Sequence, residues 1–354
     1  SFHSPVTVAL PSPNGYDTIT EAMKLRRGYY LWLQNGQGLW QPLEYRRKLL
    51  ADNQALIAKM RMGLEQDYRI PEAARQTLDG NASLVNGCLE LGALLRLAAA
   101  THAEQNNLPE AMRCALDSIA LSVQVPCGGN MSHLSLAYSC KEKGLESAWE
   151  LVDRVDAKTA RQAVTRLEKI EAQRWPVAEN LREDMQGTFR ALYHQRYARG
   201  PLGTWKDLNS WLKITGEDYA RDLWTSVTVV YEGPKVFVDY ANASIKDLQD
   251  LAQKPWDPQQ ARLPATQAPI HTYDAYGFSY LEFQQRGYRA FSLLLRTSLA
   301  LRAYKLEHGS YPNSLESLKE EGYLAMLPID PFSPTLAPLR YRKRPEGTMT
   351  LWSV

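Results

Sequence analysis

The sequence predicts a mainly α-helical protein of antiparallel helical hairpins, arranged as a solenoid or a layered bundle, with a small C-terminal α+β tail. Apolar residues recur at helical spacing over residues 16–197 of the 354-residue chain. The breaks in this pattern fall about every 15 to 25 residues, which is typical of successive helices. Short loops separate these stretches, and short connections make sequential helices antiparallel neighbours. The last part of the chain, residues 309–354, instead combines turn, short-helix and strand signals.

Individual apolar stripes define the first helices. One stripe covers residues 43–60 and follows Pro42, a residue suited to the first turn of a helix. Asn107 is the expected N-cap of a later helix, and Pro109 falls in its first turn. Two stripes around this point contain Leu84, Cys88, Leu91, Leu95, Ala98 and His102, then Leu108, Ala111, Met112, Ala115 and Ile119. We expect His102, on an apolar stripe, to be a core histidine with satisfied hydrogen bonds.

Composition divides the chain into four parts. Residues 1–14 contain three prolines and predict an extended arm, and residues 15–253 form the helical-hairpin domain. Residues 254–274 contain four prolines and predict a linker, followed by a long helix and the tail in residues 275–354. The alternating apolar residues of 225–240 are compatible with either a strand hairpin or a continuous helix. We favour helix there, since a lone hairpin is only marginally stable.

Residues that end helices or form turns define the tail. Gly309 is suited to the left-handed conformation that ends a helix, and Pro312 prevents the helix from continuing. Tyr311 is placed to pack its ring back on that helix, and Asp330-Pro331 predicts a turn before two strands, residues 339–343 and 349–353. The predicted structural motif of the tail comprises Gly309, Tyr311, Pro312, Asp330, Pro331, Tyr341 and Ser353.

The order and spacing of these tail residues resemble the periplasmic region of the major pseudopilin of type II secretion systems, a general secretion pathway protein G-like domain. This resemblance covers residues 301–353 and implies a helix followed by a small antiparallel sheet. Pseudopilins polymerise through an N-terminal apolar helix, whereas the similar segment Gly277-Phe278-Ser279-Tyr280-Leu281-Glu282 lies inside this chain and is followed by Gln284-Gln285-Arg286. The calcium loop of that family has no counterpart before Val354.

The whole chain also resembles uncharacterised bacterial proteins that are helical and anchored in a membrane by one N-terminal segment. That resemblance implies an extracytoplasmic location, in the periplasm or cell envelope, with the anchor preceding Ser1. The chain itself contains no uncharged apolar run of about 18 residues, so a polytopic membrane protein is excluded. Membrane association is therefore expected only through the upstream anchor.

Charge and motifs exclude several function classes. Forty-one basic and thirty-nine acidic residues give a net charge of +2, without the concentrated basic stripe of nucleic-acid-binding proteins. No nucleotide-binding, metalloprotease or serine-hydrolase motif is present. Cys88, Cys114, Cys127 and Cys140 lack CxxC spacing, which argues against zinc. Four free thiols, or one disulfide in an oxidising compartment, both stay open. We expect no cofactor, no metal and no catalytic residue.

Aromatic residues near the predicted linker form the only candidate ligand site. They either line a groove for a peptide or sugar, or pin the linker to the helical body. The candidate groove comprises Trp256, Tyr273, Tyr276, Phe278 and Tyr280. We therefore expect a non-enzymatic scaffold, or a protein that binds proteins or peptides, as stacked helical hairpins do. The alternatives are an accessory component of a secretion or pilus-like apparatus, and an envelope-polymer hydrolase with an unidentified site.

Overall fold

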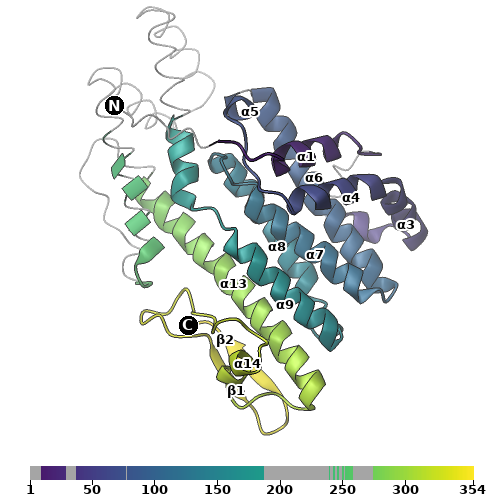
Figure 1. Cartoon of the computed structure of the whole chain (residues 1–354), viewed down its shortest axis with the longest axis vertical. Coiled ribbons are helices and arrows are strands. Elements are labelled where there is room, and N and C mark those ends of the chain that lie inside the picture. Colours follow the sequence, from purple (N-terminus) through teal and green to yellow (C-terminus); the bar gives the residue numbers. More distant parts are fainter. Residues whose placement is uncertain are drawn as a thin grey trace, which may run out of the picture. The chain divides into compact units, whose positions relative to one another are not determined.

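The protein is mainly helical, with a small two-stranded antiparallel sheet at its C-terminus, as the sequence predicts (Figure 1). The structure is a computed structural model. It describes residues 9–28, 37–76, 78–186, 239, 242–243, 245–246, 249–250, 252–257 and 274–354. In residues 75–86 and 271–281 no side chain is described.

The chain divides into two compact units. One comprises Leu10–Trp175 with Arg286–Val354, and the other comprises Ser1–Ala9 with Pro176–Gln285. The first unit thus joins segments that the sequence-based division at residues 253 and 274 assigns to separate parts. A shared core explains the joining, since Leu295 and Leu299 belong to the same buried hydrophobic cluster as Leu167. Arg161 also binds Glu307 through two hydrogen bonds of 2.8 and 2.7 Å.

The first helices pack closely because small residues lie at their crossing. A Cβ atom on Gly15 would lie 2.6 Å from the carbonyl oxygen of Gly63, so only glycine permits this approach. Asn14 caps the first helix by accepting a hydrogen bond from the backbone N–H of Tyr16. The elements of this region are α1 (Gly15–Met23), η1 (Gln37–Trp40), α3 (Leu43–Asp52), α4 (Gln54–Leu64) and α5 (Glu72–Gln76).

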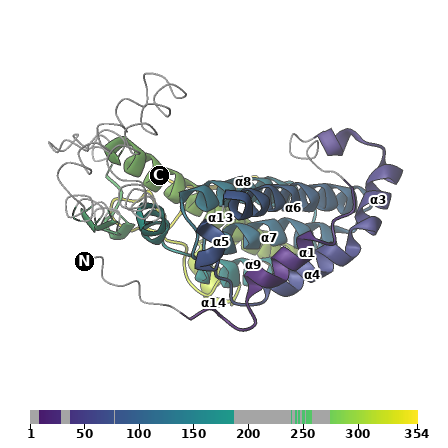
Figure 2. The ribbon, with the colours of Figure 1, turned by 90° about the horizontal axis from the view of Figure 1, so that it is seen from above.

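Four longer helices form the centre of the first unit and run side by side in Figure 2. They are α6 (Leu78–Glu104), α7 (Leu108–Gln124), α8 (Met131–Trp149) and α9 (Ala157–Ala172). The helix α7 packs on α4, α6, α8 and α9, and consecutive residues along it are buried, from Cys114 to Gln124. Gly144 allows α8 to approach α7, since a Cβ there would lie 2.8 Å from the Ala115 carbonyl oxygen.

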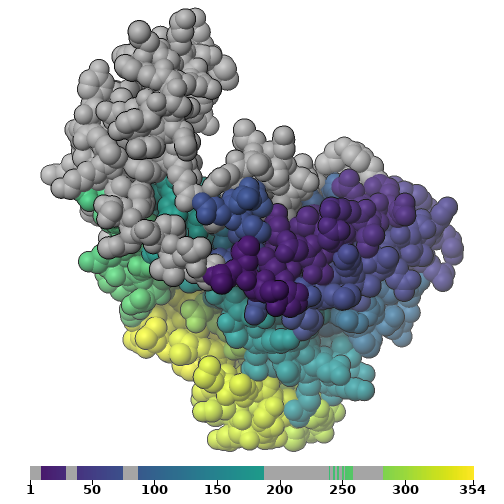
Figure 3. All heavy atoms as spheres, turned by 45° about the horizontal axis from the view of Figure 1, so that its top comes forward, coloured from purple at the N-terminus to yellow at the C-terminus, as the bar shows by residue number. Residues whose placement is uncertain are grey.

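The C-terminal region contains the long helix and the small sheet that the sequence predicts. Its elements are α13 (Asp274–His308), α14 (Glu316–Glu320), β1 (Arg340–Lys343) and β2 (Met349–Trp352). The strands pair antiparallel, with Tyr341 opposite Leu351. The tail borders α9 in Figure 3. The backbone N–H of Ala325 in the tail donates to Glu168 of α9 at 3.1 Å.

Several sequence-based expectations fall on residues outside the described part of the chain. These include residues 225–238, where a hairpin and a helix were both open, residues 258–273 of the predicted linker, and residues 1–8 of the predicted arm. Residues 9–14 of that arm contain no helix or strand. Among the described residues, no helix combines the length and apolar character needed to span a membrane.

Candidate functional site

A pocket of about 550 Å³ lies between α4, α7 and α9. Ligand pockets typically measure about 300–1,000 Å³, so this one has room for a small molecule or a few residues of a peptide. Its lining is strongly charged and includes Arg61, Glu65, Glu110, Arg113 and Arg166. The pocket lies wholly within the unit formed by Leu10–Trp175 and Arg286–Val354.

The buried carboxylate of Asp117 holds two of these arginines in place through ion pairs. The Asp117 side chain is fully buried, and its Oδ2 accepts a hydrogen bond of 2.6 Å from Arg61 Nε. Its Oδ1 accepts a second hydrogen bond from Arg166. Because α4 carries Arg61, α7 carries Asp117 and α9 carries Arg166, one carboxylate joins three helices at the pocket. A buried carboxylate is tolerated only when it is paired in this way.

The guanidinium of Arg113 has N–H donors available to bind a ligand. The Arg113 side chain is 55% exposed, and within the described part of the chain its one ion pair, to Glu110, is long at 3.9 Å. Glu110 is engaged more closely by Arg61, at 2.7 Å. An arginine with unused donors at a pocket binds carboxylates and phosphates through paired, charge-assisted hydrogen bonds. The pocket is therefore suited to an anionic ligand.

Glu65 of the pocket is poorly suited to acid catalysis. The hydrogen bond from Lys169 lowers the pKa of Glu65, whereas a general acid requires a raised pKa. Burial is the largest single influence on the pKa of Arg61 and lowers it, but the charge and hydrogen bond of Asp117, with smaller contributions from Cys114 and Glu110, together raise that pKa above its ordinary value. Arg61 therefore remains a fixed positive charge. These directions favour binding over acid–base chemistry.

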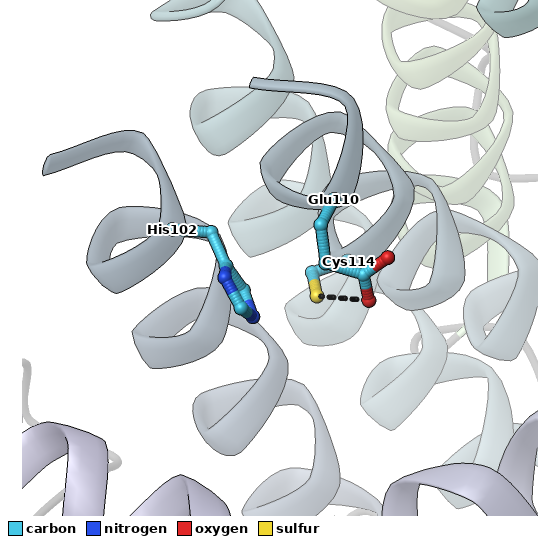
Figure 4. A group of neighbouring side chains, drawn as sticks. All are labelled: His102, Glu110 and Cys114. Atoms are coloured by element: carbon cyan, nitrogen blue, oxygen red, sulfur yellow. Dashed lines mark hydrogen bonds between the residues drawn. The ribbon is translucent and has the colours of Figure 1, made fainter. Parts of the chain in front are cut away.

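A second group of chemically versatile side chains borders this pocket. His102, at the end of α6, faces Glu110 and Cys114, which lie one turn apart on α7 (Figure 4). Their nearest nitrogen, oxygen and sulfur atoms all lie within 4.8 Å of one another. His102 Nδ1 is buried without a hydrogen-bond partner, so the expectation of a satisfied core histidine is wrong. Burial lowers the pKa of His102, which keeps its ring neutral.

The predicted aromatic groove lies mostly outside the described residues. Tyr273 and the side chains of Tyr276, Phe278 and Tyr280 belong to that undescribed part. The structure does bring Trp256 next to Phe283, with ring centroids 6.0 Å apart at an angle of 47°. Phe283 is 50% exposed. The groove itself stays a prediction.

The beginning of the predicted tail motif ends the long helix. Gly309 has a φ of +77° and its N–H donates to the Lys305 carbonyl oxygen at 2.9 Å, as a left-handed helix cap does. The ring of Tyr311 lies under Lys305 Nζ, 4.6 Å from the ring centroid. The hydroxyl of Tyr341 donates to the Pro312 carbonyl oxygen at 2.7 Å, which ties β1 to the turn after α13.

The remaining motif residues converge on Asp330, which is fully buried. Its Oδ1 accepts hydrogen bonds from the Ser353 hydroxyl at 2.7 Å and the Phe332 N–H at 2.9 Å. Its Oδ2 accepts from the Val354 N–H at 2.7 Å. The carbonyl oxygen of Pro331 accepts a hydrogen bond from Arg286 at 2.8 Å. Asp330 therefore holds the end of the chain against the turn that precedes the sheet.

All four cysteines are buried free thiols, which corresponds to one of the two alternatives from the sequence. Burial raises the pKa of Cys127 and of Cys140 to about 12, so both remain protonated near neutral pH. The Cys140 thiol donates to the carbonyl oxygen of Cys88 at 3.4 Å, across the contact of α8 with α6. Burial likewise raises the pKa of Cys114 to about 12, although Arg61 beside it acts in the opposite direction. What distinguishes Cys114 is the carboxylate and the imidazole beside it.

Sequence reasoning did not identify the charged pocket. Its ion pairs join residues far apart in the chain, such as Arg61 and Asp117, which are 56 positions apart. One local signal was available, because Glu110, Arg113 and Asp117 recur at three- and four-residue spacing on one face of a helix. An acid within an otherwise apolar run, as Asp117 is, indicates a buried ion pair.

Comparisons with protein-family models, with curated proteins and with solved structures found no match for this chain. Function is therefore inferred from the chemistry of the site itself.

Proposed function

We propose that the protein is a non-enzymatic binding protein whose α4–α7–α9 pocket takes an acidic segment of a peptide or protein. The observation that carries this proposal is the exposed guanidinium of Arg113 beside Arg61 and Arg166, in a pocket of about 550 Å³. Arg61 and Arg166 are held by buried Asp117 before any ligand arrives, so little side-chain entropy is lost on binding. Such preorganised arginines favour carboxylate side chains.

The arrangement of the helices supports a protein or peptide as the ligand. We infer that α6, α7 and α8 form consecutive antiparallel hairpins in a layered bundle, because each packs on the other two and the connections are short. Stacked helical hairpins commonly present extended surfaces to proteins. An acidic segment would lie on α7 and α9, with its carboxylates at Arg113 and Arg166.

Fluorescence anisotropy with a labelled glutamate-rich peptide tests this proposal. Substitution of Arg113 by Gln should weaken binding by about tenfold, since a charge-assisted hydrogen bond contributes about 1.5–3 kcal/mol. Arg47→Gln is the matched control, because Arg47 has the same 55% side-chain exposure but lies on α3, outside the pocket. A lysine-rich peptide should not bind. Equal weakening by both substitutions, or no saturable binding, would refute the proposal.

A second candidate function is an accessory role in a secretion or pilus-like apparatus. Its support is the pseudopilin resemblance of the tail and the order of α13, the Gly309 cap, α14 and the two strands. In the native host, deletion of residues 310–354 should then stop secretion while the truncated protein still accumulates. Normal secretion with the truncated protein present would exclude this role.

For location, we propose that the chain works outside the cytoplasm, in the periplasm or cell envelope, and is held at a membrane by a segment that precedes Ser1. The support for this is the resemblance of the whole chain to membrane-anchored helical proteins of bacteria. Fractionation of cells that express the complete gene tests it. Recovery of the protein in the membrane fraction, with the helical unit accessible to protease only after the outer envelope is opened, is the expected result; protection in the cytoplasm would contradict it.

A further inference from the structure

We propose that His102, Glu110 and Cys114 form a binding site for a single zinc ion at the edge of the charged pocket. The three side chains supply one nitrogen, one oxygen and one sulfur ligand, and these atoms lie within 4.8 Å of one another. In Figure 4 the Cys114 sulfur is drawn between the His102 ring and the Glu110 carboxylate. This site goes beyond the proposed peptide binding and does not depend on it.

Backbone geometry holds the three ligands near one another. Glu110 and Cys114 are four residues apart on α7, so their side chains share one face of the helix. Asn106 has a positive φ of 58° and reverses the chain between α6 and α7, which returns the last turn of α6 to this face. The N–H of Asn107 donates to the His102 carbonyl oxygen at 2.8 Å and fixes that turn. The site is therefore built from one short, well-ordered connection.

The distances require only a small adjustment of side chains. Zinc binds sulfur at about 2.3 Å and histidine nitrogen at about 2.0 Å, which places tetrahedral ligands about 3.5 Å apart. Cys114 Sγ now lies 3.9 Å from Glu110 Oε1. Rotation of the Glu110 side chain, which is 29% exposed, would shorten this distance. The His102 nitrogen, within 4.8 Å of the other two ligand atoms, would have to move closer as well. A water molecule would complete the four-coordinate site.

The donor set favours zinc over the common hard cations. Calcium and magnesium take six or more oxygen ligands, and only one of these three side chains offers oxygen. Thiolate and imidazole together select a softer ion such as zinc. When zinc binds, the Cys114 thiol releases its proton to solvent and the sulfur binds the metal as thiolate. His102 supplies an unprotonated ring nitrogen, and among the described residues its Nδ1 has no hydrogen-bond partner.

Arg61 competes directly with the ion. Its Nη2 lies 2.7 Å from Glu110 Oε1 and 3.4 Å from Cys114 Sγ, so when zinc is absent it pairs with the Glu110 carboxylate and donates a hydrogen bond to the Cys114 thiol. The same guanidinium is fixed to Asp117 through Nε at 2.6 Å. Zinc must therefore displace the Nη2 end of Arg61 while the Asp117 pair holds. Zinc affinity is lowered by this competition, and removal of Arg61 should raise it.

Cobalt(II) spectroscopy on the full chain, freed of affinity tags and dialysed against chelator, tests the site. One equivalent of Co²⁺ should produce the intense visible bands of a tetrahedral ion and a sulfur-to-cobalt charge-transfer band. Zinc should displace the cobalt, and the competition gives the zinc affinity. Because even partners of metal ligands change affinity by about 10–100-fold, Cys114→Ser should weaken zinc by more than about 100-fold and abolish the charge-transfer band.

Matched variants separate this site from adventitious binding. Cys127→Ser removes another buried thiol and should leave the spectrum unchanged. Arg61→Met should tighten zinc binding by about tenfold, because a neighbouring positive charge is removed. If Cys114→Ser does not fold, as judged by circular dichroism, Glu110→Gln decides, with an expected loss of about tenfold or more. A charge-transfer band that survives Cys114→Ser, or no band in the wild type, would overturn the proposal.

Discussion

Asn in place of Asp117 should destabilise the protein more than any other single change at the pocket. Asp117 is fully buried and pairs with Arg61 and with Arg166, whose side chains are only 17% and 24% exposed. Asparagine keeps the shape and one acceptor but removes the charge, so both guanidinium groups lose their compensating partner. Removal of one partner of a buried ion pair costs about 3–5 kcal/mol.

The arrangement at Asp117 places the expected loss near the lower end of that range, at about 3 kcal/mol, because both arginines retain some solvent contact and one of them keeps a hydrogen bond to the asparagine oxygen. Arg61 also keeps its ion pair with Glu110 at 2.7 Å. Urea unfolding followed by circular dichroism measures the effect as a lower midpoint at an unchanged slope. Native proteins have only about 5–15 kcal/mol of stability, so the shift should be large.

A double substitution and a control make this prediction specific. Arg61→Met in the Asp117→Asn background should recover part of the lost stability, because it removes one stranded charge. Glu65→Gln is the control, since Glu65 lines the same pocket but pairs with Lys169 where both side chains are more than 60% exposed. That change should cost less than about 1 kcal/mol. A loss below about 0.5 kcal/mol for Asp117→Asn would show that the network does not hold α4, α7 and α9 together.

Three further changes test other parts of the fold. Gly144→Ala should cost about 1–3 kcal/mol in urea unfolding, since the new Cβ would lie 2.8 Å from a backbone oxygen of α7; an unchanged midpoint would contradict the close helix contact. Asp330→Ala removes the acceptor of three hydrogen bonds, so hydrogen exchange at Val354 should accelerate while α7 stays protected; uniform acceleration would contradict a local role. Burial, with a smaller contribution from Arg174, lowers the pKa of Lys141 to about 7. Between about pH 7 and 10 the Lys141 amine is therefore protonated in the unfolded chain but largely deprotonated in the folded chain. Because the unfolded state binds more protons, the free energy of unfolding should rise with pH across this window. Lys141→Met should remove that rise. If the free energy of unfolding changes with pH equally in the wild type and in Lys141→Met, the lowered pKa of Lys141 is refuted.

Residues with a local structural meaning made much of the fold predictable. Apolar spacing and Gly309 located the long C-terminal helix within a residue of α13, because both signals act within a few residues. Asn107 was placed correctly as the N-cap of α7, although its side chain makes no capping hydrogen bond. The short helix α14 begins after Leu315, whose side chain makes no capping hydrogen bond. The sequence only weakly determines where a helix as short as α14 begins and ends.

The candidate site was not predictable, because its parts meet only after the helices pack. His102 was placed on an apolar stripe, and periodicity cannot show that the turn at Asn106 leaves its ring beside Glu110 and Cys114. Cysteine spacing was examined for CxxC pairs, and this spacing misses a ligand set that combines one cysteine with two other residue types. Long-range ion pairs such as Arg166 with Asp117 leave no periodic trace in either segment.

The most direct test of anion recognition by the α4–α7–α9 pocket is to locate a bound acidic peptide by crosslinking. A photo-crosslinking amino acid at Gln162, which lines the pocket on α9, should form covalent adducts with a glutamate-rich peptide. The same group at Tyr45, on α3 and outside the pocket, should form none. Excess unlabelled peptide should abolish the adduct at 162. Equal yields at both positions, or adducts at 45 alone, would contradict binding in the pocket.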